Sequence, residues 1–306
     1  MSVRPVTSPT TNARPTSLEL VAVGVDGRAE GRDAAALAAT IGRAIGAELL
    51  LVGVHPDPLI ALPADLGWKA THKHAEASLR EVRDALAPGA RISVKTDWSI
   101  PRALDRVVRR EHRNLLVLGS SRHAQMGRVR IGGCTRQLLG NARCALAVAP
   151  RGFAERPERR VGVIGVGYDG GPEAREALRV AGALAAAAGA SLRLRAVVDD
   201  RLPAAGWVGR GVTQRMWDEV VSSKVVSLRE EAEQNASGID AGLEIEALRG
   251  SPPELLLELA AEVDLLVIGS RRWGVRARVL LGATGEALMH DASCPVMVIP
   301  RSGAAG

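Results

Sequence analysis

Two loops rich in glycine and arginine have the composition of an anion-binding site, and they occupy matching places in the two halves of the chain. Each follows an apolar run of strand length and precedes a segment of helix length. In both loops the key glycines are 13 positions apart, Gly119 to Gly132 and Gly269 to Gly282. Glycine lets the backbone approach a ligand closely, and a helix start offers free N–H groups to an anion. The lysine of a P-loop is missing, so the pattern predicts a phosphate site of another kind.

These loops belong to a repeat that spans nearly the whole sequence. Strand-length apolar runs alternate with helix-length segments in the order βαβαβαβαβ, first in residues 18–150 and again in residues 160–301. In each copy an aspartate followed by glycine ends the first strand, Asp26 in one and Asp169 in the other. The alternation predicts two α/β domains, each with a parallel sheet covered by helices on both faces. The length of 306 residues is also typical of two domains.

The expected elements follow from these runs. The predicted strands are residues 18–25, 49–54, 92–96, 115–118, 145–149, 161–166, 192–198, 243–248, 265–268 and 296–299. The main predicted helices are residues 34–46, 72–86, 101–112, 173–189, 216–234 and 253–262. Residues 1–17 and 302–306 are expected to be tails, and residues 151–159 a polar linker.

The composition narrows the classes of function. A net charge of +6 suggests nucleic-acid binding, but aromatic residues are only 2% and leave almost no side chains for base stacking. The sequence therefore predicts no nucleic-acid partner. No apolar run approaches the roughly 18 residues of a membrane span, and the N-terminus lacks the apolar core of a signal peptide. We expect a cytoplasmic protein with no membrane partner.

The side chains that could do chemistry do not form a catalytic set. No nucleophile, base and orienting group can be put together from the spacing, so the sequence predicts no catalytic residue, and no metal ligands either. Cys134 stands at an expected helix start, where its pKa could be lowered for a redox role. Cys144 and Cys294 occupy matching places and are expected to be packing residues. Asp26 and Asp169 could also serve only as helix caps.

The chain resembles the universal stress protein (UspA) family in a tandem, two-domain form. The resemblance rests on GVDG and GYDGGPEA at the ends of the first strands and on the family's G-x2-G-x9-G-[ST] loop. It implies flavodoxin-like, Rossmann-like domains with a five-stranded parallel sheet in the order 3-2-1-4-5, and a ligand at the carboxyl ends of strands one and four. It also implies a stress-response regulator that binds ATP, with Mg2+ only in company with the nucleotide. A homo-oligomer is expected, and slow ATP hydrolysis stays open.

The resemblance also transfers the nucleotide-binding residues by position. In the first copy they are Asp26, Val54, Gly119, Ser120, Arg122, Gly132, Gly133 and Thr135. In the second copy they are Asp169, Val197, Gly269, Ser270, Arg272, Gly282, Ala283 and Thr284.

Both copies depart from the family motif at the same place. Arg122 and Arg272 stand where the family has its second glycine, and Gly133 and Ala283 replace the hydroxyl residue after the third. The arginines could bind a phosphate through a charge-assisted hydrogen bond. They could equally fill the crevice and leave a structural or interaction module that binds no nucleotide.

The apolar last strands are expected to pair between the domains, because exposed apolar edges are normally covered.

Overall fold

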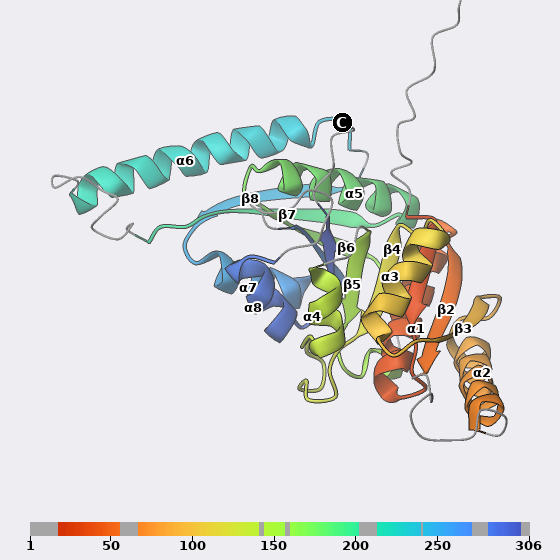
Figure 1. Ribbon diagram of the computed structural model, residues 1–306. Coiled ribbons are helices and arrows are strands. Elements are labelled where there is room, and N and C mark those ends of the chain that lie inside the picture. The colour runs from red at the N-terminus through yellow and green to blue at the C-terminus, as the bar shows by residue number, and fades with distance from the viewer. Residues whose placement is uncertain are drawn as a thin grey trace, which may run out of the picture.

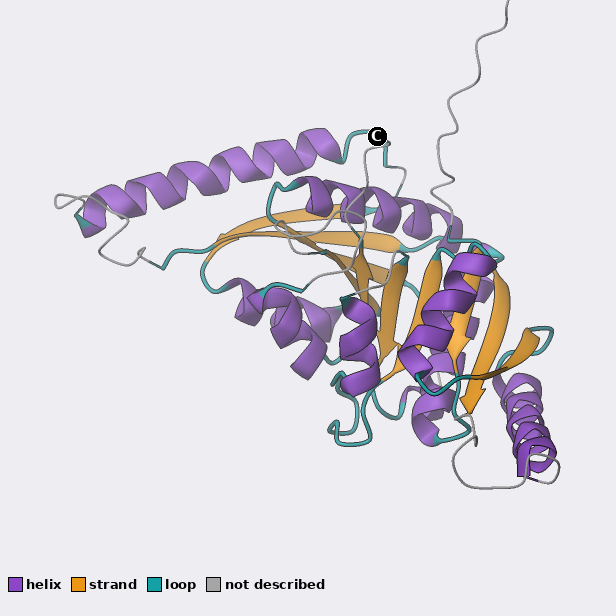
Figure 2. Ribbon diagram, viewed as in Figure 1, coloured by secondary structure: helices purple, strands orange, loops and turns teal. Residues whose placement is uncertain are grey.

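A computed structural model describes residues 18–55, 67–140, 144–156, 160–201, 213–239, 241–270 and 281–300, with the backbone alone for residues 67–71. Within these ranges the strands form a single ten-stranded sheet in the order β3-β2-β1-β4-β5-β10-β9-β6-β7-β8. Helices cover both of its faces (Figures 1 and 2). Among the described residues, no helix is both long and apolar enough to cross a membrane.

The elements occur twice in the same succession. The strands are β1 (Leu20–Gly24), β2 (Glu48–His55), β3 (Arg91–Thr96), β4 (Leu115–Gly119), β5 (Ala145–Ala149), β6 (Val163–Tyr168), β7 (Ser191–Val198), β8 (Leu243–Arg249), β9 (Leu265–Gly269) and β10 (Val296–Ile299). The helices are α1 (Ala29–Ile45), α2 (Gly67–Leu86), α3 (Ile100–Arg110), α4 (Gly133–Leu139), the short 3-10 helix η1 (Phe153–Glu155), α5 (Pro172–Ala188), α6 (Gln214–Asn235), α7 (Pro252–Glu262) and α8 (Ala283–Asp291).

Each half has the predicted parallel sheet in the order 3-2-1-4-5, and the two sheets join at their last strands. β5 and β10 pair in antiparallel fashion, with Ala147 opposite Met297 at the centre of the register. The expected pairing of the last strands between the halves is therefore confirmed. β5 and β10 are buried along their whole length, and their sequences are continuously apolar, as is usual for strands that are covered on both faces.

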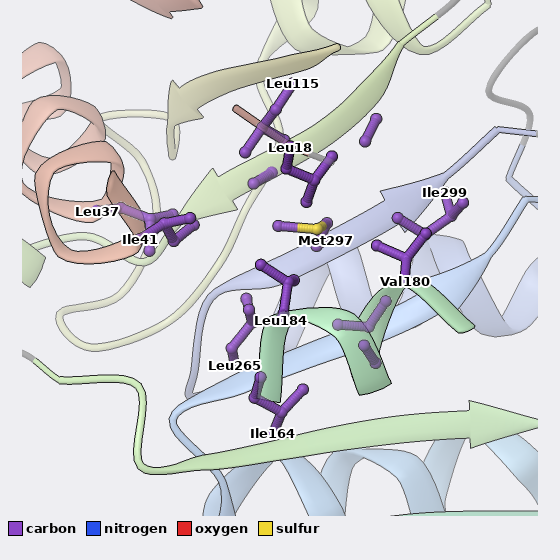
Figure 3. Close-up of a cluster of buried hydrophobic side chains, with 14 of the residues drawn as sticks. Leu18, Leu37, Ile41, Leu115, Ile164, Val180, Leu184, Leu265, Met297 and Ile299 are labelled. Atoms are coloured by element: carbon purple, nitrogen blue, oxygen red, sulfur yellow. The ribbon is translucent and has the colours of Figure 1, made fainter. Parts of the chain in front are cut away.

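The hydrophobic core is continuous across this junction. Helices α1, α2, α5 and α6 contribute to one face, while α3, α4, α7 and α8 contribute to the other. Figure 3 shows Leu37 and Ile41 of α1 and Val180 and Leu184 of α5 in one cluster with Met297 of β10. Helices α1 and α5 also contact each other directly. The two halves thus share apolar surface in addition to strand hydrogen bonds.

The first helix begins at Ala29, earlier than the expected range of 34–46. The cause is a close approach that periodicity does not reveal. A Cβ on Gly31 would come within 2.8 Å of the backbone nitrogen of Asp26, so only glycine lets this turn of the helix pack against the end of β1. The alanine-rich segment that suggested the helix is its later part, which is buried from Ala34 to Gly42.

The first part of the predicted linker is folded. Phe153 is 4% exposed and belongs to the core. The N–H groups of Gly152 and Ala154 donate to the two carboxylate oxygens of Asp33 on α1, each at 2.8 Å. Burial raises the pKa of this carboxyl group although both hydrogen bonds favour its charged form. Residues 157–159 lie outside the described part of the chain.

Candidate functional site

All eight residues predicted for the first copy line one crevice, at the carboxyl ends of the central strands. The cavity has a volume of about 250 Å3. β1, β2 and β4 end at its floor, and the first turns of α1 and α4 form its sides. The predicted residues along it are Asp26, Val54, Gly119, Ser120, Arg122, Gly132, Gly133 and Thr135. The crevice lies where the strand order reverses, the usual ligand position in such sheets.

The glycines of this loop serve two different purposes. A Cβ on Gly119 would lie only 2.0 Å from the carbonyl oxygen of Glu30, so this glycine is needed for the packing of α1 against β4. Around Gly133, in contrast, no described atom lies within 4 Å of such a Cβ, and at Gly132 the nearest is 3.7 Å away. Packing within the protein therefore explains Gly119 but leaves the open space beside Gly132 and Gly133 for something else.

Ser120 fastens the loop to the sheet. Its hydroxyl donates to the carbonyl oxygen of Ala149 at 2.7 Å and accepts a hydrogen bond from the N–H of Arg130 at 3.2 Å. The side chain is 2% exposed. Ser120 thus shapes the wall of the crevice, while its hydroxyl is already engaged within the protein.

The two aspartates after the first strands each hold a turn. The Asp26 carboxylate accepts a hydrogen bond from the N–H of Arg28 at 3.1 Å, and that of Asp169 accepts one from Gly171 at 2.8 Å. The N-cap residues of α1 and α5 are Arg28 and Gly171, so the aspartates stand just outside the helices. Both are exposed and line their crevices.

Arg122 lies at the side of the first crevice without closing it. The residue is exposed and lines the cavity. Its Nε–H donates to Nε2 of His123 at 3.3 Å, and His123 is exposed as well. The guanidinium therefore belongs to the rim. Its counterpart Arg272 falls in residues 271–280, outside the described part of the chain.

The second crevice has the same position in its half and a cavity of about 310 Å3. Five of its predicted residues line it, namely Asp169, Val197, Gly269, Ser270 and Thr284. Gly282 and Ala283 begin α8 but are absent from the described lining. Gly269 repeats the role of Gly119, because its Cβ would lie 2.6 Å from the backbone of Glu173.

The charged residues of the two linings differ. In the first crevice Arg28 and Arg122 accompany Asp26 and Glu30. In the second, the charged side chains of the described lining are all acidic: Asp169, Glu173 and Asp199. The described walls of the first crevice therefore suit an anion better.

The pKa of Cys134 is not lowered, although its place at a helix start allowed that reading and the redox role that would go with it. Burial raises the pKa of this thiol to about 11, and the charge of Asp26 across the crevice adds to the rise. Removal from water outweighs the helix start, because burial disfavours the thiolate. Cys144 and Cys294 are buried packing residues as expected, and burial raises the pKa of each to about 12.

Sequence reasoning missed the contribution of α3 to the first crevice. Ile100, the first residue of this helix, lines the cavity and is 43% exposed, and Leu104 lies one turn further on. The Ser99 hydroxyl accepts a hydrogen bond from the N–H of Arg102 and so fixes the helix start. An isoleucine next to a serine cap, beside a proline in the first turn, was the available signal.

Comparisons with known proteins agree with this architecture. The universal stress protein family matches residues 19–150 and residues 161–300. Universal stress protein Rv2005c of Mycobacterium tuberculosis is 24% identical over 300 residues, which cover 95% of this chain and 100% of the relative. Universal stress protein Slr1101 of Synechocystis is 30% identical over 109 residues, which cover 34% of this chain and 97% of that protein.

Solved structures show the same fold over nearly the full length. A universal stress protein from Archaeoglobus fulgidus has a TM-score of 0.61 at 18% identity and covers 92% of this chain and 97% of its own. The functionally unknown protein PA1789 from Pseudomonas aeruginosa PAO1 has a TM-score of 0.61 at 16% identity, with 93% and 94% covered. Together with the two matched regions, these likenesses lead to one conclusion: the chain belongs to the universal stress protein family and carries two of its domains in tandem.

Proposed function

We propose that the protein is a nucleotide-binding regulator of the stress response, and that the first crevice is its principal site for ATP or a related adenine nucleotide. The observation that carries the proposal is the convergence of all eight predicted residues on one open cavity. The second crevice, which has five of its predicted residues in its described lining, is the second site of the proposal.

The residues of the first crevice fit the parts of a nucleotide. Val52, Ile100 and Leu104 give the cavity an apolar wall that suits a base. Its volume of about 250 Å3 lies just below the usual range of ligand pockets, roughly 300–1,000 Å3, so it suits the adenosine part with the phosphates at the rim. Gly133 leaves open space there, and Arg122 brings a positive charge to the same side.

The proposal includes Mg2+ only as the partner of nucleotide phosphates. Within the described ranges, no group of three or more His, Cys, Asp or Glu side chains is placed to hold a metal ion. Mg2+ commonly binds through substrate phosphates and one or two carboxylates. The exposed carboxylate of Asp26 at the mouth of the first crevice could serve such an ion.

Calorimetric titration of ATP into the full chain tests the proposal. We expect Asp26→Ala to weaken binding at the first crevice and Asp169→Ala to weaken binding at the second, while the domains stay folded, because both side chains are exposed. Glu19→Ala is the matched control: this carboxylate is exposed in the same half but precedes β1, at the opposite end from Asp26. Unchanged affinity in both aspartate variants would remove these residues from the site.

The direction in which Arg122→Gly changes the affinity for ATP decides the role of Arg122. If its guanidinium binds a phosphate, Arg122→Gly should cost roughly 1.5–3 kcal/mol of binding free energy, about a tenfold to hundredfold rise in Kd. The position of Arg122 on the rim supports this expectation. Tighter binding after Arg122→Gly would instead show that the arginine obstructs the crevice. Absence of ATP binding to every variant and to the parent chain would favour an interaction module.

A further inference from the structure

The loop that walls the first crevice is hydrogen-bonded to a helix of the other half. The N–H of Val129 donates to the carbonyl oxygen of Ala292 at 2.8 Å, and the N–H of Ile131 donates to that of Met289 at 3.0 Å. The guanidinium of Arg128 donates to the carbonyl oxygen of Asp291 at 2.9 Å. These three acceptors belong to the end of α8. The loop therefore occupies carbonyl groups that a helix end leaves without intrahelical partners.

Residues 129–131 of this loop are also hydrogen-bonded to the wall of the first crevice. Between Val129 and Ile131, the N–H of Arg130 donates to the Ser120 hydroxyl at 3.2 Å, and its carbonyl oxygen accepts from the N–H of Ser121 at 2.7 Å. Alternate residues thus bond to opposite sides, as in an extended chain. Residues 129–131 form a splint with the first crevice on one side and α8 on the other.

The opposite end of α8 lies in the second crevice. Thr284 and Gly285 in its first turns line that cavity. The helix has nine residues and so spans about 13 Å. Leu288 and Met289 are fully buried in the close-packed core. A short helix packed in this way moves as one rigid unit, so a displacement of its first turn also displaces its last carbonyl groups.

We infer that the two crevices are energetically coupled through α8 and the splint of residues 129–131. The inference rests on the proposed function, because it concerns ligands in those crevices. A ligand that contacts the first turn of α8 changes the position of the carbonyl groups of Met289 and Ala292. The bonded N–H groups follow, and Ile131 directly precedes Gly132 on the wall of the first crevice. By reciprocity, a ligand in the first crevice affects the second by the same factor.

Calorimetry on the full chain measures this coupling. Titration of ATP into Asp169→Ala reports chiefly the first crevice, because binding at the second is weakened, and titration into Asp26→Ala reports chiefly the second. If the two crevices bind ATP independently, the isotherm of the parent chain equals the sum of the isotherms of the two variants. We expect a departure that corresponds to a change in Kd of about fivefold or more, the lower end of typical allosteric coupling. An additive isotherm would overturn the inference while leaving the proposed function intact.

A matched pair of arginine variants tests the route. Arg128→Ala removes the side-chain bond to α8 and should reduce the coupling factor. Arg130→Ala removes the same charge from the same loop. The guanidinium of Arg130 bonds to the carbonyl oxygen of His123 within the first half, so the coupling factor should be unchanged in this variant. Equal coupling factors in the two variants would show that the Arg128 contact is not part of the route.

Hydrogen exchange tests the relay without any nucleotide. Thr284→Trp places an indole in the second crevice against the first turn of α8. We expect altered exchange at the amides of Val129 and Ile131. The amide of Asp97, bonded to the carbonyl oxygen of His55 at 3.2 Å far from α8, should be unchanged. Unchanged exchange at all three amides would overturn the relay. If ATP binds neither crevice, the proposed function fails. The exchange measurement still shows whether a change at the first turn of α8 reaches residues 129–131.

Discussion

Gly119 ends the strand before the loop of the first crevice and Gly133 begins the helix after it, but the structure assigns them opposite responses to one added methyl group. A Cβ on Gly119 would lie 2.0 Å from the carbonyl oxygen of Glu30, whereas no described atom approaches within 4 Å of one on Gly133. Neither glycine has a positive φ. The response to Gly→Ala at these two positions is therefore decided by space alone.

The magnitude for Gly119→Ala follows from the distance. Carbon and carbonyl oxygen approach to about 3.3 Å even in close contacts, so the start of α1 and the end of β4 must separate by about 1.3 Å. The opposing atom is backbone and cannot move by changing a rotamer. Overpacking typically costs about 1–3 kcal/mol, and we expect Gly119→Ala to lie at the upper end of that range.

Gly133→Ala is the matched comparison. In a conformation open to other residues, replacing glycine with alanine typically stabilises a protein by about 0.4–1 kcal/mol through the unfolded chain. We expect a small gain in the free energy of unfolding for this variant. The matching residue of the second copy is Ala283, and the family motif has Ser or Thr at this place, so a Cβ here is compatible with a ligand and ATP affinity should change little.

Urea denaturation followed by circular dichroism measures both free energies of unfolding, and calorimetry measures ATP binding to Gly133→Ala. A Gly119→Ala protein as stable as the parent chain would refute the tight contact between α1 and β4. A Gly133→Ala protein that is strongly destabilised, or that binds ATP much more weakly than its parent, would refute the open space beside Gly133.

Two further predictions concern ionisable groups. The pKa of Cys134 is raised to about 11, so its labelling by iodoacetamide should be slow at pH 7.5 and should accelerate about tenfold per pH unit up to pH 10. Mass spectrometry measures the rate of labelling. A rate that levels off near pH 8.5 would contradict the raised pKa. The Arg102 guanidinium, bonded at 2.7 Å, holds the pKa of the Asp97 carboxyl below its ordinary value, and the N–H of Ser99 and the charge of Arg106 act in the same direction. A lowered folded pKa contributes stability that is present above the ordinary value, about 3.9, and is lost as the pH falls through the folded pKa. In urea denaturation, Asp97→Asn should therefore be less stable than the parent chain at pH 7, and the difference should shrink at pH 3; a constant difference would oppose this origin.

The fold was predictable because its signals are local. Apolar runs, the glycine spacing and the repeated order of elements each depend on neighbouring residues. The first crevice was predictable because parallel strands deliver their carboxyl ends to one edge, which brought Asp26, Val54 and Gly119 together. The pairing of β5 with β10 followed from the need to cover apolar edges.

What the sequence did not reveal depends on tertiary contacts. The early start of α1 rests on the approach of Gly31 to Asp26. The raised pKa of Cys134 depends on burial, which the helix position alone does not report. The bonds from Val129 and Ile131 to α8 are made by backbone N–H groups, which every residue except proline possesses. No residue type marks such a contact in advance.

The antiparallel pairing of β5 with β10 within one chain also frees the molecule from symmetry. In a pair of identical subunits, any substitution appears in both crevices at once, whereas here each crevice can change alone. Cys134 and Thr284 occupy matching positions in the two linings, and so do Val25 and Tyr168. The chain therefore behaves like a heterodimer that is always assembled in a one-to-one ratio. Each crevice can therefore acquire a chemistry of its own.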